Sequence, residues 1–179
     1  IDGWRLDVAN ELDDGFLRAF RAAVKDAKPD ALIVGEVWEN AAHYLNGDML
    51  DSSMNYDFRR YCRRFFAEET VGAETFDTNV STLLLRYREN ALYVQLNLLD
   101  SHDVSRYMTL CSEDMEKMEL SVLFQMTFPG MPCVFYGNEK GLSGTTESEY
   151  RQAMAWEKTH PLEDVYRRLI ALRKDHPAL

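Results

Sequence analysis

Short apolar runs alternate with amphipathic segments along the whole chain of 179 residues. The apolar runs have the length of buried strands, and the first of them stops at Asp7. The other predicted strands are Ala31–Val37, Asp51–Tyr56, Leu92–Asp100 and Pro132–Tyr136. Apolar residues recur at helical spacing in the segments 12–28, 57–69, 76–87, 115–126 and 165–172. This rhythm predicts an α/β fold with a parallel sheet covered by helices.

The five predicted strands are too few to close an eight-stranded barrel. The chain starts a few residues before Asp7 and stops directly after a helical segment, at Leu179. We therefore expect both ends to be cuts through a larger domain, which leaves the first and last strands as open edges. Open edges and uncovered apolar residues predict that the isolated chain self-associates and has little or no activity.

An acidic residue stands where each of three apolar runs stops. Asp7 closes the first run, Glu36 closes the second, and Asp103 follows the run that ends at Asp100. In a parallel sheet the carboxyl ends of the strands meet at one edge, where substrates bind. The three acids together predict the catalytic site of an enzyme.

Four ordered motifs identify a family that the chain resembles. They are Gly3–Glu11, Gly35–Trp38, Leu98–Asp103 and Gly130–Gly137. In order, they resemble motifs on strands four, five, seven and eight of the α-amylase family of glycoside hydrolases. Asn10-Glu11 and Met54–Tyr56 look most like the neopullulanase, cyclomaltodextrinase and maltogenic amylase branch. The resemblance implies an α/β fold that is a partial TIM (β/α)8 barrel, with strands four to eight and their helices. Residues 1–179 would then be the C-terminal half of the catalytic barrel domain.

The resemblance also implies roles for individual residues. Asp7 would be the nucleophile and Glu36 the general acid/base, while Asp103 and His102 would grip the hydroxyls of the sugar beside the scissile bond. Five further residues are substrate-binding candidates. Arg5 would be the partner of the nucleophile, and Trp38 and Tyr56 would be stacking surfaces for sugar rings. Asn10 and Glu11 would face the leaving group.

The surroundings of the first two acids agree with this division of labour. Arg5 stands two residues before Asp7, so both project to the same side of the strand, and Arg5 can hold Asp7 ionised through a charge-assisted hydrogen bond. Glu36 follows a wholly apolar run, and partial removal from water favours the protonated form that an acid needs.

The implied function is a retaining α-glycoside hydrolase or transglycosylase. It would cleave α-1,4-glucosidic bonds of maltooligosaccharides, cyclodextrins, pullulan or starch through a covalent glycosyl-enzyme intermediate. One alternative is an α-glucosidase or sugar isomerase of the same family. Another is a non-catalytic amylase-like binding module, although such a protein usually loses one of the acids, and Asp7, Glu36 and Asp103 are all present.

Each candidate also has a structural interpretation. An acid at a strand end is often only a helix cap or turn residue, and Arg5 can serve as a structural ion-pair partner. His102 can bond a backbone carbonyl, and Trp38 and Tyr56 can be core or rim aromatics. The arginines at 59, 60, 63 and 64 are predicted to form a solvated helix face.

Composition excludes several classes of partner. A net charge of −10 leaves no basic patch for nucleic acid, and no apolar stretch reaches the length of a membrane span. Three cysteines without paired spacing indicate reduced thiols and favour the cytoplasm. The histidines outside the motifs show no ligand-like spacing, so no metal site is predicted from them, and calcium is left open for a longer parent protein.

Overall fold

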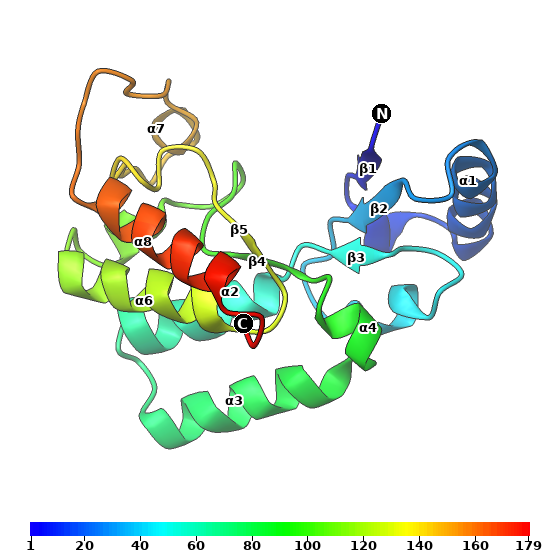
Figure 1. Cartoon of the computed structure of the whole chain (residues 1–179), viewed down its shortest axis with the longest axis horizontal. Coiled ribbons are helices and arrows are strands. Elements are labelled where there is room, and N and C mark those ends of the chain that lie inside the picture. The colour runs from blue at the N-terminus through cyan, green and yellow to red at the C-terminus, as the bar shows by residue number, and fades with distance from the viewer.

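The computed structural model covers residues 1–179 and contains five short parallel strands (Figure 1). The strands are β1 (Gly3–Leu6), β2 (Leu32–Gly35), β3 (Ser52–Ser53), β4 (Leu96–Leu98) and β5 (Met131–Cys133). Strands β1, β2 and β3 pair in chain order, and β4 pairs with β5. A bridge between Met54 and Leu96 joins the two sets, so the array follows the order of the chain. The predicted parallel α/β alternation is confirmed.

Helices occupy the five segments in which the sequence predicts them. They are α1 (Asp14–Ala27), α2 (Tyr56–Cys62) with its π-helical continuation η3 (Arg63–Ala67), α3 (Ala73–Arg86), α6 (Met115–Thr127) and α8 (Leu162–Asp175). In Figure 1, α1 lies beside the β1–β3 set, whereas α2, α6 and α8 gather around β4 and β5. None of these helices is both long and apolar enough to cross a membrane.

Short helical turns in the connections were not predicted. They are η1 (Ala9–Glu11), η2 (Ala42–Leu45), α4 (Glu89–Leu92), α5 (Tyr107–Leu110) and α7 (Glu147–Tyr150). Each contains three or four residues, which is too short for helical periodicity to be visible in the sequence. Three of them lie in the loops that follow strands: η1 after β1, η2 after β2 and α5 after β4.

Helix α1 begins two residues later than the predicted start at residue 12 because Asp13 is its N-cap. The Asp13 carboxylate accepts a hydrogen bond from the Phe16 backbone N–H at 3.1 Å. Such a cap contributes about 1 kcal/mol to helix stability. Leu17 is buried and Phe20 and Val24 pack against the core, whereas Phe16 is exposed.

The strands are shorter than predicted. The run from Leu92 gives only the three residues of β4, because Leu92 itself ends helix α4. The run from Asp51 to Tyr56 gives only β3, because Asn55 caps α2 by accepting a hydrogen bond from the Phe58 N–H. The last strand, β5, ends at Cys133, three residues before the predicted end.

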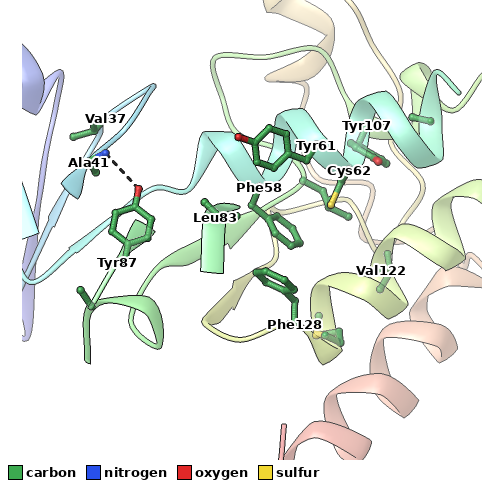
Figure 2. Close-up of a cluster of buried hydrophobic side chains, with 14 of the residues drawn as sticks. Val37, Ala41, Phe58, Tyr61, Cys62, Leu83, Tyr87, Tyr107, Val122 and Phe128 are labelled. Carbon is green, nitrogen blue, oxygen red and sulfur yellow. Dashed lines mark hydrogen bonds between the residues drawn. The ribbon is translucent and has the colours of Figure 1, made fainter. Parts of the chain in front are cut away.

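One hydrophobic core holds the helices on the strands, and Figure 2 shows part of it. The Phe58 ring of α2 packs against Phe128 at the end of α6, with 5.3 Å between ring centroids. A fully buried side chain of this size contributes about 1.5 to 3 kcal/mol. At the other side of the cluster, the Ala41 N–H donates to the Tyr87 hydroxyl at 3.3 Å, which ties the end of α3 to the loop after β2 (Figure 2).

Both outer strands have a neighbour on one side only. Strand β1 pairs only with β2, and β5 pairs only with β4. Apolar side chains are exposed along or beside these strands, including Trp4 on β1 and both Val134 and Tyr136 after β5. The two open edges predicted from the sequence are therefore present.

Candidate active site

The three predicted acids lie beyond the carboxyl ends of three strands. Asp7 directly follows β1, Glu36 directly follows β2, and Asp103 lies in the loop after β4. The register pairs Leu6 with Gly35, so Asp7 and Glu36 leave the sheet side by side. The sheet therefore brings two carboxyl groups to one point of its edge.

Arg5 connects these two carboxyl groups. Its Nη1 forms an ion pair with Asp7, and its Nη2 lies 3.0 Å from Glu36 Oε2. The pair with Asp7 is the one that the sequence predicts, and the contact with Glu36 was not foreseen. The Asp7 side chain is 73% exposed, whereas that of Glu36 is 4% exposed. One guanidinium thus faces an accessible carboxylate and a buried one.

The turn after Asp7 supplies a second donor to Glu36. Val8 has a left-handed backbone, with φ 44° and ψ 47°, which is unusual for a β-branched residue. This conformation directs the Val8 N–H to Glu36 Oε2 at 2.9 Å. The next residue, Ala9, donates its N–H to the Glu36 backbone oxygen at 2.9 Å. A strained residue of this kind costs about 1 to 3 kcal/mol and is typical of functional sites.

Glu36 is buried, as its apolar flanks predict, but its polar partners were not predicted. The Val8 N–H donates a hydrogen bond to Glu36 Oε2, and the Arg5 guanidinium forms an ion pair with the same oxygen. Glu36 is therefore a buried carboxyl group held by one backbone donor and one guanidinium.

An imidazole and a guanidinium contact the Asp103 carboxyl group. His102 Nε2 lies 2.9 Å from Asp103 Oδ2, and Arg151 Nη2 donates to Oδ1 at 3.0 Å. Arg151 also donates from Nε to the His102 carbonyl at 2.8 Å. Arg151 follows α7 in the connection between β5 and α8. Nothing in the sequence pattern indicated it, because it lies 48 residues from Asp103.

Tyr56 links the two groups of acids. Its hydroxyl lies 3.1 Å from Ser101 Oγ, which accepts the Asp103 N–H at 3.2 Å. Burial, together with the negative charges of Glu36 and Asp103, raises the pKa of Tyr56 to about 12. Tyr56 therefore lies within electrostatic reach of both acids and keeps its proton at neutral pH.

Trp38 covers Tyr56. The two rings stack with centroids 3.9 Å apart and planes 10° from parallel. Tyr56 is buried, whereas Trp38 is 41% exposed. Of the two interpretations given for Tyr56, a stacking surface for sugar or a core aromatic, its burial and its stacking on Trp38 favour the core aromatic. Trp38 is the one of the two with an open surface.

The two leaving-group candidates lie apart from these contacts. Asn10 and Glu11 are both exposed in η1, just after Asp7 and Val8. The Asn10 carbonyl accepts a hydrogen bond from the Tyr44 hydroxyl at 3.3 Å. The structure places both residues near the end of β1 and shows no hydrogen bond from either side chain to the three acids.

Three further features concern possible metal sites, the cysteines and a groove outside the site. No group of three or more His, Cys, Asp or Glu side chains is arranged to hold a metal ion. The three cysteines are free; Cys62 and Cys111 are buried and Cys133 is partly exposed. A groove of about 630 Å³ lies between α6 and α8 and is lined by none of the predicted site residues.

Comparison with known proteins gives one consistent result. The family described as "Alpha amylase, catalytic domain" matches residues 1–178. Neopullulanase 2 of Thermoactinomyces vulgaris is 48% identical over 176 residues, which are 97% of this chain and 30% of that protein. The intracellular maltogenic amylase of Bacillus subtilis (strain 168) is 42% identical over 182 residues, covering all of this chain and 31% of that protein.

A solved structure agrees with these sequence relatives. A cyclomaltodextrinase superimposes with a TM-score of 0.95 at 44% identity, covering 98% of this chain and 31% of the other. The chain thus spans about 30% of the length of the curated relatives it matches.

Proposed function

Because the chain belongs to the α-amylase family and matches part of its catalytic domain, we propose that it forms part of a retaining α-glucan hydrolase or transglycosylase. The substrates would be α-1,4-linked maltooligosaccharides, cyclodextrins, pullulan or starch, in line with the names of its neopullulanase and cyclomaltodextrinase relatives. Residues 1–179 would be the C-terminal half of a (β/α)8 barrel, with strands four to eight.

The observation that carries this proposal is the Arg5 bridge between Asp7 and Glu36 at the ends of adjacent strands. Retaining glycosidases hold two carboxyl groups about 5 to 5.5 Å apart, one as nucleophile and one as acid/base. Two carboxyl groups that share one guanidinium fit such a close pair. We assign Asp7 as the nucleophile because its side chain is exposed and paired with a cation.

Glu36 is the complementary acid/base. In the first step it donates a proton to the leaving oxygen while Asp7 forms a bond to the anomeric carbon. Asp7 loses its charge as the ester forms, and Glu36 gains a charge as its proton leaves. Arg5 contacts both groups, so one negative charge faces the guanidinium before and after this step. In the second step Glu36 takes a proton from water, whose oxygen bonds to the anomeric carbon as the bond from that carbon to Asp7 breaks, and Asp7 is released as a carboxylate.

The other candidates act on the substrate around this pair. Asp103 and His102 would bind hydroxyls of the sugar beside the scissile bond, with contacts that strengthen as the ring flattens. Trp38 would offer its exposed ring to a neighbouring sugar. Asn10 and Glu11 would face the leaving group and influence whether water or another sugar accepts the glycosyl unit.

The test uses the full-length protein that contains this chain, with maltotriose, β-cyclodextrin and pullulan as substrates. Asp7→Asn and Glu36→Gln should each lower turnover by roughly 10²- to 10⁴-fold. The exposed α3 residues Asp77 and Glu74 provide matched controls, Asp77→Asn and Glu74→Gln, which should leave turnover unchanged. Equal turnover in the wild type and both site variants would overturn the assignment.

Location and assembly complete the proposal. We place the enzyme in the cytoplasm, where its free cysteines would stay reduced and where the name of its intracellular Bacillus relative also puts that protein. We expect the 179-residue chain alone to have little activity and to associate through its open strand edges.

A further inference from the structure

Helix α2 holds both ends of the loop that carries two of the proposed substrate-binding residues. Arg59 of α2 donates from Nε to the Leu99 carbonyl at 2.8 Å. The same guanidinium donates from Nη2 to the Ser105 carbonyl at 3.0 Å. His102 and Asp103 lie between these two anchors. The span of the loop is therefore fixed by one rigid, planar side chain.

Arg59 has no solvated alternative to these partners. It is 6% exposed, so the prediction that it belongs to a solvated arginine face is wrong for this residue, whereas Arg64 is exposed. A buried cation is stable only when its donors are satisfied, and the carbonyl groups of Leu99 and Ser105 satisfy two of them. The buried Asp100 carboxyl group lies close to Arg59 and attracts its guanidinium once it is ionised. The Arg59 side chain therefore bonds the loop and not solvent.

The middle of the loop is tied to the same helix. Tyr56, at the first position of α2, contacts Ser101 Oγ, which in turn accepts the Asp103 N–H. Helix α2 thus contacts the loop near its start, its centre and its end. This arrangement defines the backbone path of the loop independently of any sugar.

We propose that Arg59 is a positioning residue that sets the placement of Asp103 and His102 for substrate. It touches no substrate itself and acts through the loop between Leu99 and Ser105. This inference rests on the proposed function for its catalytic consequence, but its structural part stands without it. A shift of about 1 Å in a substrate-binding group can lower turnover by roughly 100-fold, so a clamp on the loop has a measurable effect.

Arg59→Lys is the direct test. Lysine keeps the charge but carries one compact ammonium group, which cannot bond two carbonyls at opposite ends of a loop as the guanidinium fork does. In the full-length protein, kcat/KM should fall roughly 10- to 100-fold. Arg64→Lys, on the following turn of the same continuous helix, is the matched control and should leave kcat/KM unchanged.

A double-mutant cycle separates positioning from a general structural effect. If Arg59 acts through Asp103 and His102, then Arg59→Lys should change kcat/KM less than about twofold when both are already replaced in Asp103→Asn/His102→Gln, because coupled residues are not additive. An equal fold-loss in both backgrounds would overturn the proposal, since it would show that Arg59 acts elsewhere.

Amide hydrogen exchange gives a readout that does not depend on activity. The amides of residues 100–105 should exchange at least about tenfold faster in Arg59→Lys, while those of α1 keep their wild-type rates. Unchanged exchange in this loop would overturn the proposal even if catalysis is impaired. If the wild-type protein proves inactive, the proposed function fails, and exchange alone decides the positioning role. Should Arg59→Lys not fold, Arg59→Gln, which keeps one uncharged NH2 group in place of the guanidinium fork, replaces it in both measurements.

Discussion

Arg5 is the residue on which the site depends most. Its two terminal nitrogens face different carboxyl groups, one exposed and one buried, and the proposed reaction passes one negative charge from Asp7 to Glu36. A planar fork can serve both positions without moving, because its donors are fixed relative to one another. The residue therefore does more than keep one carboxylate ionised.

The first prediction follows from this fork. Arg5→Lys retains the charge but brings one ammonium group to a place where two carboxyl groups need a donor. We expect kcat to fall by roughly 10²-fold, comparable to the loss of one preorganised donor at a reacting charge. Arg88→Lys, at an exposed position before α4, is the control. Steady-state kinetics with wild-type kcat in Arg5→Lys would contradict the shared role of the guanidinium.

At the scale of elements, the loops after the strands matter more than the strands themselves. The loop after β4 begins with Asp100, whose Oδ1 accepts the Tyr107 N–H at 2.7 Å. Burial raises the pKa of Asp100 to about 7, against the lowering effect of the nearby cations Arg59 and Arg106. The loop that carries Asp103 therefore starts at a buried group that titrates near neutral pH.

The second prediction concerns stability and pH. The pKa of Asp100 is about 7 in the folded protein, whereas the pKa of an aspartate in an unfolded chain is about 3.9. Stability should thus fall as pH rises through this interval, by at most about 4 kcal/mol. Asp100→Asn keeps the oxygen that accepts the Tyr107 N–H and removes the titration. Urea unfolding at pH 4.5 and 7.5 should show a smaller loss of stability in this variant than in the wild type. The exposed control Asp30→Asn should lose as much stability as the wild type. An equal loss of stability in Asp100→Asn and the wild type would contradict the account.

The third prediction concerns the contact between α2 and α3. Asp57 of α2 is buried and forms ion pairs with Arg86 at the end of α3 and with the exposed Arg60. Arg86→Met should destabilise the fold by about 3 to 5 kcal/mol, because it leaves a buried carboxylate without the less exposed of its two partners. Arg60→Met should cost much less, since that side chain is half exposed. Similar urea midpoints for the two variants would contradict this ranking.

The sequence predicts a helix or strand correctly where apolar residues recur with one clear period. It does not predict features that depend on side-chain contacts formed in the folded chain. The order of strands and helices follows from apolar periodicity, and Asp7, Glu36 and Asp103 follow from strand ends. Strand β3 consists of two buried serines, and the Ser53 hydroxyl donates to Gln95 Oε1 at 2.6 Å, a contact that no hydropathy pattern reveals. Arg151 was missed for a similar reason, because its contact with Asp103 exists only after the chain has folded.

At the scale of the whole molecule, the array of strands is open. Its outer strands β1 and β5 lack a neighbour on one side, and the chain corresponds to less than a third of the length of its relatives. The three acids lie at the carboxyl edge of this open array.

The fourth prediction is that the 179-residue chain self-associates when it is prepared alone. Unpaired strand edges and exposed apolar side chains such as Trp4 and Tyr136 favour pairing between copies. Light scattering should report dimers or larger species at micromolar concentration. Trp4→Lys, which places a charge on the β1 edge, should shift the distribution toward monomer. A monodisperse wild-type monomer would contradict this expectation.

The anomeric configuration of the first product tests the central claim most directly. Maltotriose or β-cyclodextrin is given to the full-length protein, and proton NMR follows the new reducing end before it mutarotates. A close pair of carboxyl groups at Asp7 and Glu36 predicts that the α-anomer forms first, because two successive displacements retain configuration. If the β-anomer forms first, the reaction is a single displacement by water, and the assignment of Asp7 as a nucleophile is wrong.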